Sequence, residues 1–258
     1  MKGKKTEKGL LSALRQSIRG DFEGFFLYYQ LLVFAESGEI MGAEALLRWK
    51  KEPYGEVMPD RLIPLLEKED CFFDLGRWIL QQAMQDGKLF LRKKPDFILN
   101  VNISVRQMEQ KGFVKELFSL LQAQRFPFQN LCLELTERGK LEHMKRLNDT
   151  FSLLRRCGLK IAIDDFGTGT AALHLLRNLQ VDYLKIDRLF VAEIVENKAD
   201  QAIVKAVIDC AEQLQIHVCL EGVENQEQLQ YLSRFPAEIH QGYYYGKPIQ
   251  RKEFLALL

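Results

Sequence analysis

Residues 25–49 read FFLYYQLLVFAESGEIMGAEALLRW, and this stretch decides the fold. Two runs rich in aromatic and branched residues, 25–30 (continuing towards 33) and 40–49, have the composition of β-strands. Only a short polar connection around Glu36-Ser37-Gly38-Glu39 separates them. Parallel neighbours need a crossover of about a dozen residues or more. We therefore predict that the first two strands of this protein are antiparallel.

The rest of the chain alternates between strand-like and helix-like segments. After a first helix at 8–19, a Pro-containing segment is expected at 59–67 and helices near 73–86, 107–122, 140–157, 171–179, 199–215 and 225–235. Six further strands lie near positions 98, 131, 160, 183, 216 and 239. Alternating elements indicate a mostly parallel sheet with helices outside, and eight strands in a chain of 258 residues favour a closed barrel. The predicted fold is α/β, a modified TIM-type (β/α)8 barrel with an antiparallel first strand.

The composition narrows the range of partners. The chain is 47% hydrophobic and its net charge is +1, which disfavours a nucleic-acid polymer as partner. Five scattered cysteines without a C-x-x-C spacing are typical of reduced core thiols, so we expect a cytoplasmic protein. No apolar run approaches the length of about 20 residues that a membrane span needs. We expect residues 1–20 to be an N-terminal lead-in and helix, which could link the chain to an upstream domain, and residues 21–258 to be the barrel.

Polar residues follow six of the apolar runs. They are Glu44, Asn102, Glu134, the pair Asp164 and Asp165, Lys185, and Glu221. A buried carboxylate costs several kcal/mol unless it is paired or binds a metal. Since active sites of β/α barrels form at the carboxyl ends of the strands, we expect these side chains to meet at that rim.

The chemistry of this set favours a hard divalent cation. Carboxylate and amide oxygens select Mg²⁺ or Mn²⁺ over zinc. Five carboxylates exceed what one Mg²⁺ takes, which favours two ions about 3.5–4 Å apart, with a bridging carboxylate from Asp164 or Asp165. Lys185 would then orient a metal-bound water, and Arg48 would contact a phosphate. Ca²⁺ should inhibit, because it prefers longer bonds than a compact site provides.

Each of these residues also has an ordinary interpretation when taken alone. Glu44 could be a surface residue of an amphipathic strand, Asn102 a turn residue, and Asp164-Asp165 a loop and helix cap. Lys185 and Asp187 could form a simple ion pair. Repetition at the same end of six strands favours a shared site. A sugar-cleaving barrel also uses two carboxylates, but it would not need five together with Asn102 and Lys185.

Seven motifs, in order, resemble the EAL-domain family of cyclic di-GMP phosphodiesterases. They are Glu44-Ala45-Leu46, Asn102-Ile103-Ser104, Glu134-Leu135-Thr136-Glu137, Asp164-Asp165-Phe166-Gly167-Thr168-Gly169, Lys185-Ile186-Asp187, Glu221-Gly222-Val223-Glu224 and Gln241-Gly242-Tyr243. The resemblance covers residues 25–258. It implies hydrolysis of one phosphodiester bond of cyclic di-GMP to linear pGpG, on a barrel whose first strand is antiparallel.

The resemblance also implies roles for individual residues. The metal ligands would be Glu44, Asn102, Glu134, Asp164, Asp165 and Glu221. Lys185, Glu221 and Glu44 would be catalytic, and Arg48, Gln30 and Gln241 would bind substrate. Thr136, Glu137, Asp187 and Glu224 would support the site. A homodimer, and an upstream sensor or cyclase domain joined through residues 1–20, are further expectations.

The sequence departs from the family pattern at three places, namely Leu31, the run Thr170-Ala171-Ala172, and Leu220. None removes a proposed ligand, so the departures at Leu31 and in the loop bear on rate, dimer coupling and regulation. The alternative function is a catalytically silent cyclic di-GMP receptor. That alternative predicts missing ligands, and none is missing from the sequence.

Overall fold

The computed structural model describes residues 6–136, 144–168 and 172–258. The N-terminal elements are α1 (Glu7–Arg19), β1 (Phe25–Phe34), β2 (Ile40–Lys51), β3 (Gly55–Val57), α2 (Pro59–Leu66) and α3 (Cys71–Lys93). The following elements are β4 (Ile98–Ile103), α4 (Val105–Glu109), α5 (Phe113–Gln124), β5 (Leu131–Thr136), α6 (Met144–Arg156), β6 (Lys160–Phe166) and α7 (Ala172–Asn178). The last are β7 (Tyr183–Ile186), α8 (Arg188–Val191), α9 (Lys198–Gln213), β8 (His217–Glu221), α10 (Gln226–Leu232), β9 (Ile239–Gln241), β10 (Ile249–Gln250) and α11 (Arg251–Leu255).

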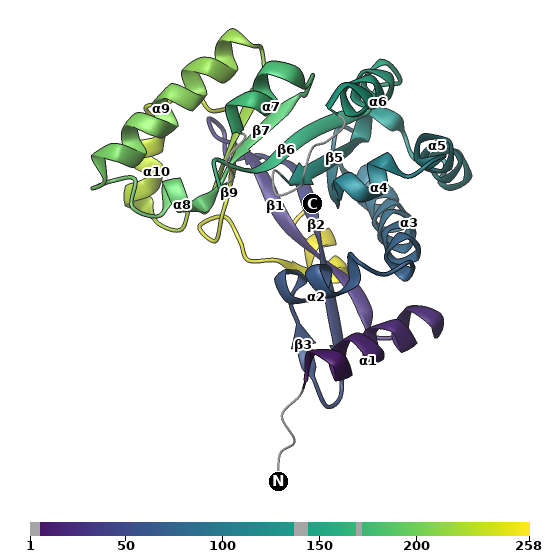
Figure 1. Ribbon diagram of the computed structural model, residues 1–258. Helices are drawn as coiled ribbons and strands as arrows, with labels where there is room; N and C mark the ends of the chain where they lie inside the picture. The colour runs from purple at the N-terminus through teal and green to yellow at the C-terminus, as the bar shows by residue number, and fades with distance from the viewer. Residues whose placement is uncertain (1–5, 137–143, 169–171) are drawn as a thin grey trace.

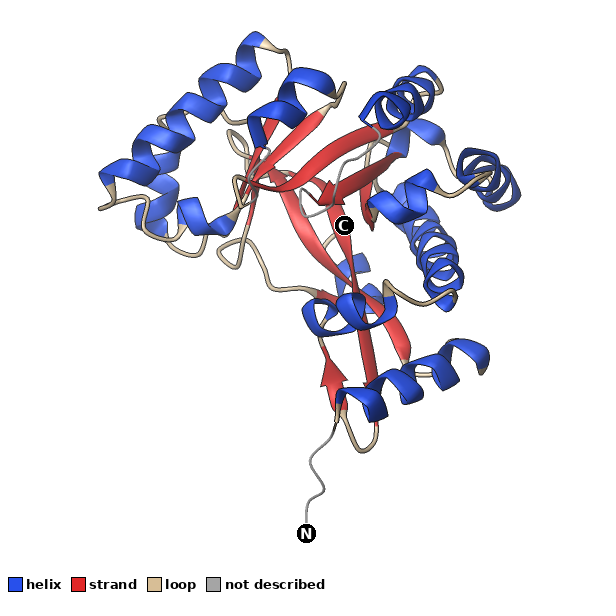
Figure 2. Ribbon diagram, viewed as in Figure 1, coloured by secondary structure: helices blue, strands red, loops and turns tan. Residues whose placement is uncertain are grey.

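Eight strands close into a barrel, as predicted. Parallel pairing runs from β2 through β4, β5, β6, β7 and β8 to β9, and β1 pairs antiparallel with both β2 and β9. Figure 2 shows the strands at the centre with the helices outside. The short connection between β1 and β2 therefore has the predicted consequence, and it places Gln30 opposite Glu44 in the register.

The helix predicted at 107–122 is wrong as a single element, because the chain forms α4 and α5 instead. The break ends at Gly112, whose φ of +91° lies in the left-handed region that glycine tolerates. A helix cannot continue through such a residue. Among the described elements, β3, β10, α8 and α11 are short additions that the sequence pattern does not predict.

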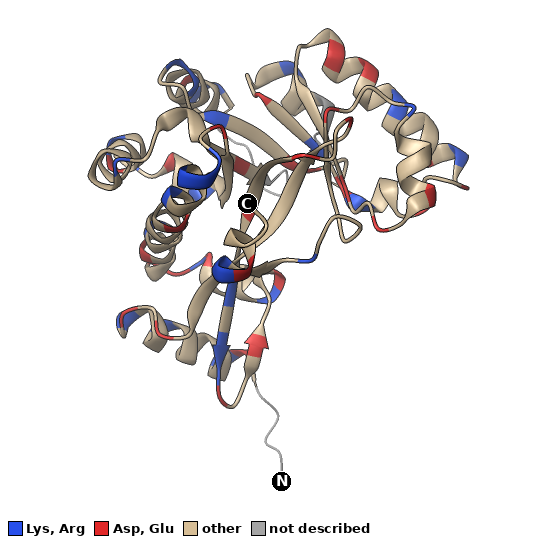
Figure 3. Ribbon diagram, turned by 180° about the vertical axis from the view of Figure 1, so that it is seen from behind, with Lys and Arg blue, Asp and Glu red and all other residues tan. Residues whose placement is uncertain are grey.

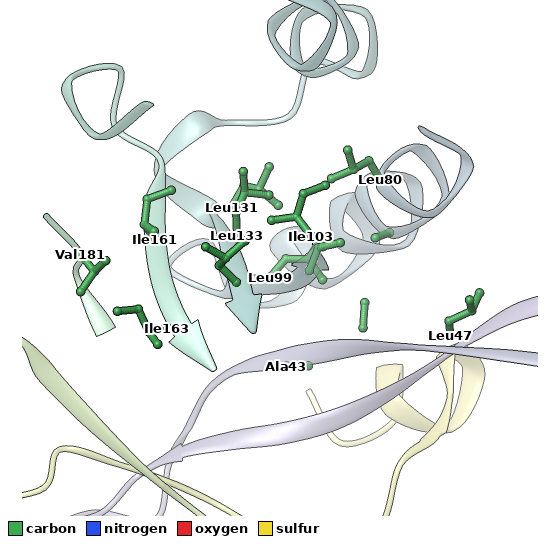
Figure 4. Close-up of a cluster of buried hydrophobic side chains, with 14 of the residues drawn as sticks. Ala43, Leu47, Leu80, Leu99, Ile103, Leu131, Leu133, Ile161, Ile163 and Val181 are labelled. Atoms are coloured by element: carbon green, nitrogen blue, oxygen red, sulfur yellow. The ribbon is translucent and has the colours of Figure 1, made fainter. Parts of the chain in front are cut away.

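Strand alternation divides the apolar residues into two layers. One face of the strands packs against the surrounding helices, as Leu99, Leu133 and Ile161 do in the cluster of Figure 4. A smaller buried cluster contains Leu32, Met41, Cys219 and Ile239, with Ile98 and Tyr183 packed against it. Leu32, Cys219 and Ile239 each lie two positions from a polar residue of the same strand, so they share a strand face with the polar residues. This cluster is therefore an apolar layer next to the polar end of the barrel.

The N-terminal helix packs onto the strands. Leu10, Leu14 and Ile18 of α1 are buried in the main core, and Trp49 Nε1 donates a 3.1 Å hydrogen bond to Ser17 Oγ. Figure 1 shows α1, α2 and β3 gathered at the far ends of β1 and β2, away from α7 and α9. The domain boundary near residue 20 stays a prediction.

Charged residues of both signs are interspersed over the helices, as Figure 3 shows from behind. This distribution accords with the net charge of +1. Among the described helices, none combines the length and the apolar composition that a membrane span requires.

Candidate metal centre

Lys185 lies at the centre of a buried carboxylate cluster. Its Nζ is 2.8 Å from Glu221 Oε1, 3.0 Å from Asp164 Oδ1, and 3.1 Å from both Glu44 Oε2 and Glu134 Oε2. The four acids come from β2, β5, β6 and β8, and the lysine from β7. The structure thus brings together five predicted site residues from five different strands.

Three amide side chains fix the orientation of two of these carboxylates. Asn102 Nδ2 donates to Glu44 Oε1 at 2.6 Å, and Gln241 Nε2 donates to Glu44 Oε2 at 2.8 Å. Asn100 Nδ2 donates to Glu134 Oε1 at 2.6 Å. Asn100 was not predicted as a site residue. Its position two residues before Asn102 is the signal that would have found it, because alternate residues of a strand share a face.

The carboxylates form two groups that share one member. Oxygen atoms of Glu44, Glu134 and Asp164 lie within 4.8 Å of one another, and so do oxygens of Asp164, Asp165 and Glu221. Asp164 belongs to both groups, which is the arrangement of a bridging ligand between two cations. These all-oxygen groups fit a hard divalent ion.

The electrostatics of the cluster show an excess of negative charge. Burial raises the pKa of Glu221 to about 8, and it raises the pKa of Glu134 well above the ordinary value, assisted by the nearby Glu44 charge. Burial likewise raises the pKa of Asp164. For Glu44, burial is outweighed by the Lys185 charge and hydrogen bonds, and the pKa is lowered.

Lys185 supplies only one positive charge to this site. Burial disfavours the ammonium form, but the charges of the surrounding carboxylates outweigh that effect and raise the pKa of Lys185 well above its ordinary value. One ammonium cannot neutralise four ionised acids. Protons on the raised carboxylates, or bound cations, must balance the remaining charge.

The predicted substrate residues extend from this cluster along β1, β2 and β9. Gln241 Nε2 also lies 3.3 Å from Gln30 Oε1, which joins both glutamines to the site. Arg48 is buried, lies 5.5 Å from the centre of the Tyr28 ring and is 3.9 Å from Glu56. It stands four residues beyond Glu44 on the same face of β2. Its contact with a phosphate stays a prediction.

The four predicted supporting residues have different placements. Asp187 caps α8, since its Oδ1 accepts a 2.8 Å hydrogen bond from Leu189 N. The ion-pair partners of Lys185 are the four carboxylates described above. Glu224 is exposed, and its backbone N–H donates to Gln228 Oε1 at 2.7 Å. Thr136 ends β5 opposite Asp164. Glu137 lies outside the described residues.

Comparison with known proteins identifies the family. The sequence profile of the EAL domain matches residues 11–248. The chain belongs to the EAL domain family. It is 33% identical over 248 residues to the bifunctional diguanylate cyclase/cyclic di-GMP phosphodiesterase MucR of Pseudomonas aeruginosa, covering 96% of this chain and 36% of MucR. It is 34% identical over 223 residues to the probable cyclic di-GMP phosphodiesterase PdeG of Escherichia coli, covering 86% of this chain and 44% of PdeG.

Solved structures of EAL proteins have the same fold. The chain is 34% identical to the EAL enzyme Bd1971 in its cAMP- and cyclic-di-GMP-bound form, with a TM-score of 0.90 over 97% of this chain and 68% of that one. It is 31% identical to the MucR phosphodiesterase in complex with cyclic di-GMP, with a TM-score of 0.88 over 95% of this chain and 99% of that one. The chain spans less than half the length of the two curated relatives, at 36% and 44%.

Proposed function

We propose that this protein hydrolyses one phosphodiester bond of cyclic di-GMP to linear pGpG, with Mg²⁺ or Mn²⁺ bound at the carboxylate cluster. The observation that carries the proposal is the pair of acidic groups sharing Asp164, with Lys185 in contact with members of both. Relatives named as cyclic di-GMP phosphodiesterases support the choice of substrate.

Each side chain has a role in this proposal. Glu44, Asn102, Glu134, Asp164, Asp165 and Glu221 would hold two divalent ions. When bound, such ions would lower the pKa of a water so that it can lose a proton and act as a nucleophile near neutral pH, and they would offset charge on the phosphate. Lys185 would hold a positive charge beside the attacking water and orient it, and Glu221 would accept a proton. Arg48 would bind a substrate phosphate, and Gln30 and Gln241 would position the substrate at the rim of the barrel.

The deciding experiment is an assay of purified protein with cyclic di-GMP and Mn²⁺, in which pGpG is measured by chromatography. Glu44→Ala and Asp164→Asn should each lower the rate by more than the factor of about 10–100 seen for loss of an outer metal partner. Glu36→Ala, at an exposed turn, is the matched control and should keep the wild-type rate. A folded Glu44→Ala protein with an unchanged rate would contradict the site assignment.

The same assay distinguishes the alternative function of a silent cyclic di-GMP receptor. A receptor would bind the labelled dinucleotide and release none as pGpG at any Mn²⁺ concentration. We favour the enzyme because the predicted carboxylates and Asn102 are present in the sequence, and four of the carboxylates contact Lys185.

The identity of the metal and the assembly are further parts of the proposal. Mg²⁺ or Mn²⁺ should activate, whereas Ca²⁺ should inhibit because it prefers longer and looser coordination. Full activity in excess chelator would exclude the metal mechanism.

We also propose a homodimer, testable by sedimentation, and an upstream sensor or cyclase domain in the full protein, testable from the length of the native polypeptide.

A further inference from the structure

The short helix α8 (Arg188–Val191) lies against the two backbone segments that carry Asp165 and Glu221. A β-carbon on Gly167 would lie 2.5 Å from Phe190 Cε2, so the Phe190 ring rests directly on that backbone. A β-carbon on Gly222 would collide with Arg188 Cβ. Gly167 follows Asp165 by two residues, and Gly222 directly follows Glu221. Both close approaches therefore lie next to proposed metal ligands.

The strand ladder does not continue regularly through Asp165. The pairing of β6 with β7 shifts register between Ile163 and Phe166, and Asp165 itself has a left-handed φ of +52°. A residue in this conformation keeps it only where the surroundings hold it. The packing of Phe190 on Gly167 is one such surrounding contact.

The helix is itself anchored to the chain that follows Glu221. Gln228 is buried, and its Nε2 donates to Val191 O at 3.2 Å and to Ala192 O at 3.1 Å. Its Oε1 accepts from Glu224 N at 2.7 Å. At the other end, Asp187 caps the helix through Leu189 N. These hydrogen bonds join the segments after Lys185 and Glu221, and Phe190 packs on the loop after Asp165.

We infer that α8 is a spacer that sets the separation of Asp165 and Glu221, with Phe190 as a positioning residue for the cation held by Asp164, Asp165 and Glu221. The inference rests on the proposed metal-dependent function. The cation group of Glu44, Glu134 and Asp164 contains neither Asp165 nor Glu221. Loss of the Phe190 ring should therefore weaken one cation site and leave the other intact.

The test is Mn²⁺ binding measured by calorimetry, which does not depend on turnover. Wild-type protein should bind two ions. Phe190→Ala should lower the affinity for one of them by about 10–100-fold, the usual effect of losing support for a metal ligand. Phe190→Tyr keeps the ring and should restore binding. Leu189→Ala is the matched control, since Leu189 is on the same helix and 65% exposed.

Two ligand variants assign the affected site. In the Glu134→Gln background, Phe190→Ala should lower the Mn²⁺ affinity of the remaining site by the same factor. In the Glu221→Gln background, Phe190→Ala should leave the Mn²⁺ affinity unchanged. An equal loss of Mn²⁺ affinity in both backgrounds, or no loss in either, would contradict the spacer role of α8. If Phe190→Ala does not fold, Phe190→Leu decides the question by the same comparison. A wild-type protein that binds no Mn²⁺ contradicts the proposed function, whereas two ions bound equally well by wild type and Phe190→Ala contradict only the spacer.

Discussion

At the scale of single residues, Lys185 is the side chain on which the site depends. It is 1% exposed and contacts carboxylates from four other strands. Removing one partner from a buried ion cluster is costly, because the remaining charges lose their compensation. A lysine at this position therefore stabilises the cluster, and in the proposed function it would place a positive charge beside the reacting groups.

We expect Lys185→Met to lower kcat by about 100-fold or more while KM changes much less. The proposed contact of Lys185 is with the attacking water, so its contribution belongs to the transition state. Steady-state kinetics with cyclic di-GMP and Mn²⁺ would measure both constants. Lys205→Met, at an exposed ion pair on α9, should leave both unchanged. A higher KM with an unchanged kcat would instead make Lys185 a binding residue.

The apparent affinity for Mn²⁺ should rise with pH and level off above about 8. In the metal-free protein the pKa of Glu221 is raised to about 8, chiefly by burial, so a proton occupies this carboxyl at pH 6.5. A cation must displace that proton, and the displacement costs less as the pH approaches the pKa. The raised pKa values of Glu134 and Asp164 act in the same direction.

Calorimetric titrations at several pH values in buffers of different ionisation enthalpy would check this prediction. They would report the affinity and the protons released for each ion bound. An affinity that is constant from pH 6 to pH 8.5, with no proton released, would show that the carboxylates are already ionised before the metal binds.

Most of the charged cluster was predictable from the sequence, because acids at successive strand ends of a barrel share a rim. Asn100 was missed because it lies inside an apolar strand. Its spacing from Asn102 indicates a shared face, but its contact with Glu134 is visible only in three dimensions. The position of Lys185 between both acidic groups was also not predictable. Spacing places a residue on a rim, but it does not fix the side-chain contacts made across the barrel.

At the scale of elements, regular strands and long helices were predictable, and short elements were not. The helix predicted near 225–235 forms as α10, and Asn225 and Gln228 make both reciprocal hydrogen bonds of a capping box at its start. Helix α8 has four residues, too few for a hydrophobic period to appear. The break between α4 and α5 depends on the conformation of one glycine.

Gly112→Ala isolates the cost of that break. A β-carbon at Gly112 would meet no atom within 4 Å, so the variant strains the backbone of the folded protein without a steric clash. A left-handed alanine costs about 1–2 kcal/mol, which for a chain of this size lowers the Tm by about 2–4 °C per kcal/mol. Thermal unfolding would measure the shift, with Gln110→Ala, at an ordinary extended backbone, as control. An unchanged Tm would show that the loop relaxes without strain.

At the scale of the whole molecule, closure of the barrel depends on β1, which pairs antiparallel with its neighbours on both sides. The direction of β1 was predictable from the short connection to β2. The side chains that tie it to distant parts of the chain were not. Tyr29 is fully buried and its hydroxyl donates a 2.7 Å hydrogen bond to Asp86 Oδ2 on α3. Asp86 Oδ1 is 3.0 Å from Arg251 NH1 on α11 and accepts from Gln82.

Tyr29→Phe should destabilise the protein by about 1–3 kcal/mol, because it removes one hydroxyl and leaves a buried carboxylate oxygen with one partner fewer. Burial and the Asp86 charge raise the pKa of Tyr29 well above its ordinary value, so the hydroxyl remains the donor throughout the accessible pH range. Urea unfolding would measure the loss. Tyr244→Phe removes the same group from an exposed residue, 41% accessible, whose hydroxyl donates to Gln226. That control should change the stability by less than about 0.5 kcal/mol. Equal losses in the two variants would mean that the Tyr29–Asp86 contact contributes nothing specific to holding β1, α3 and α11 together.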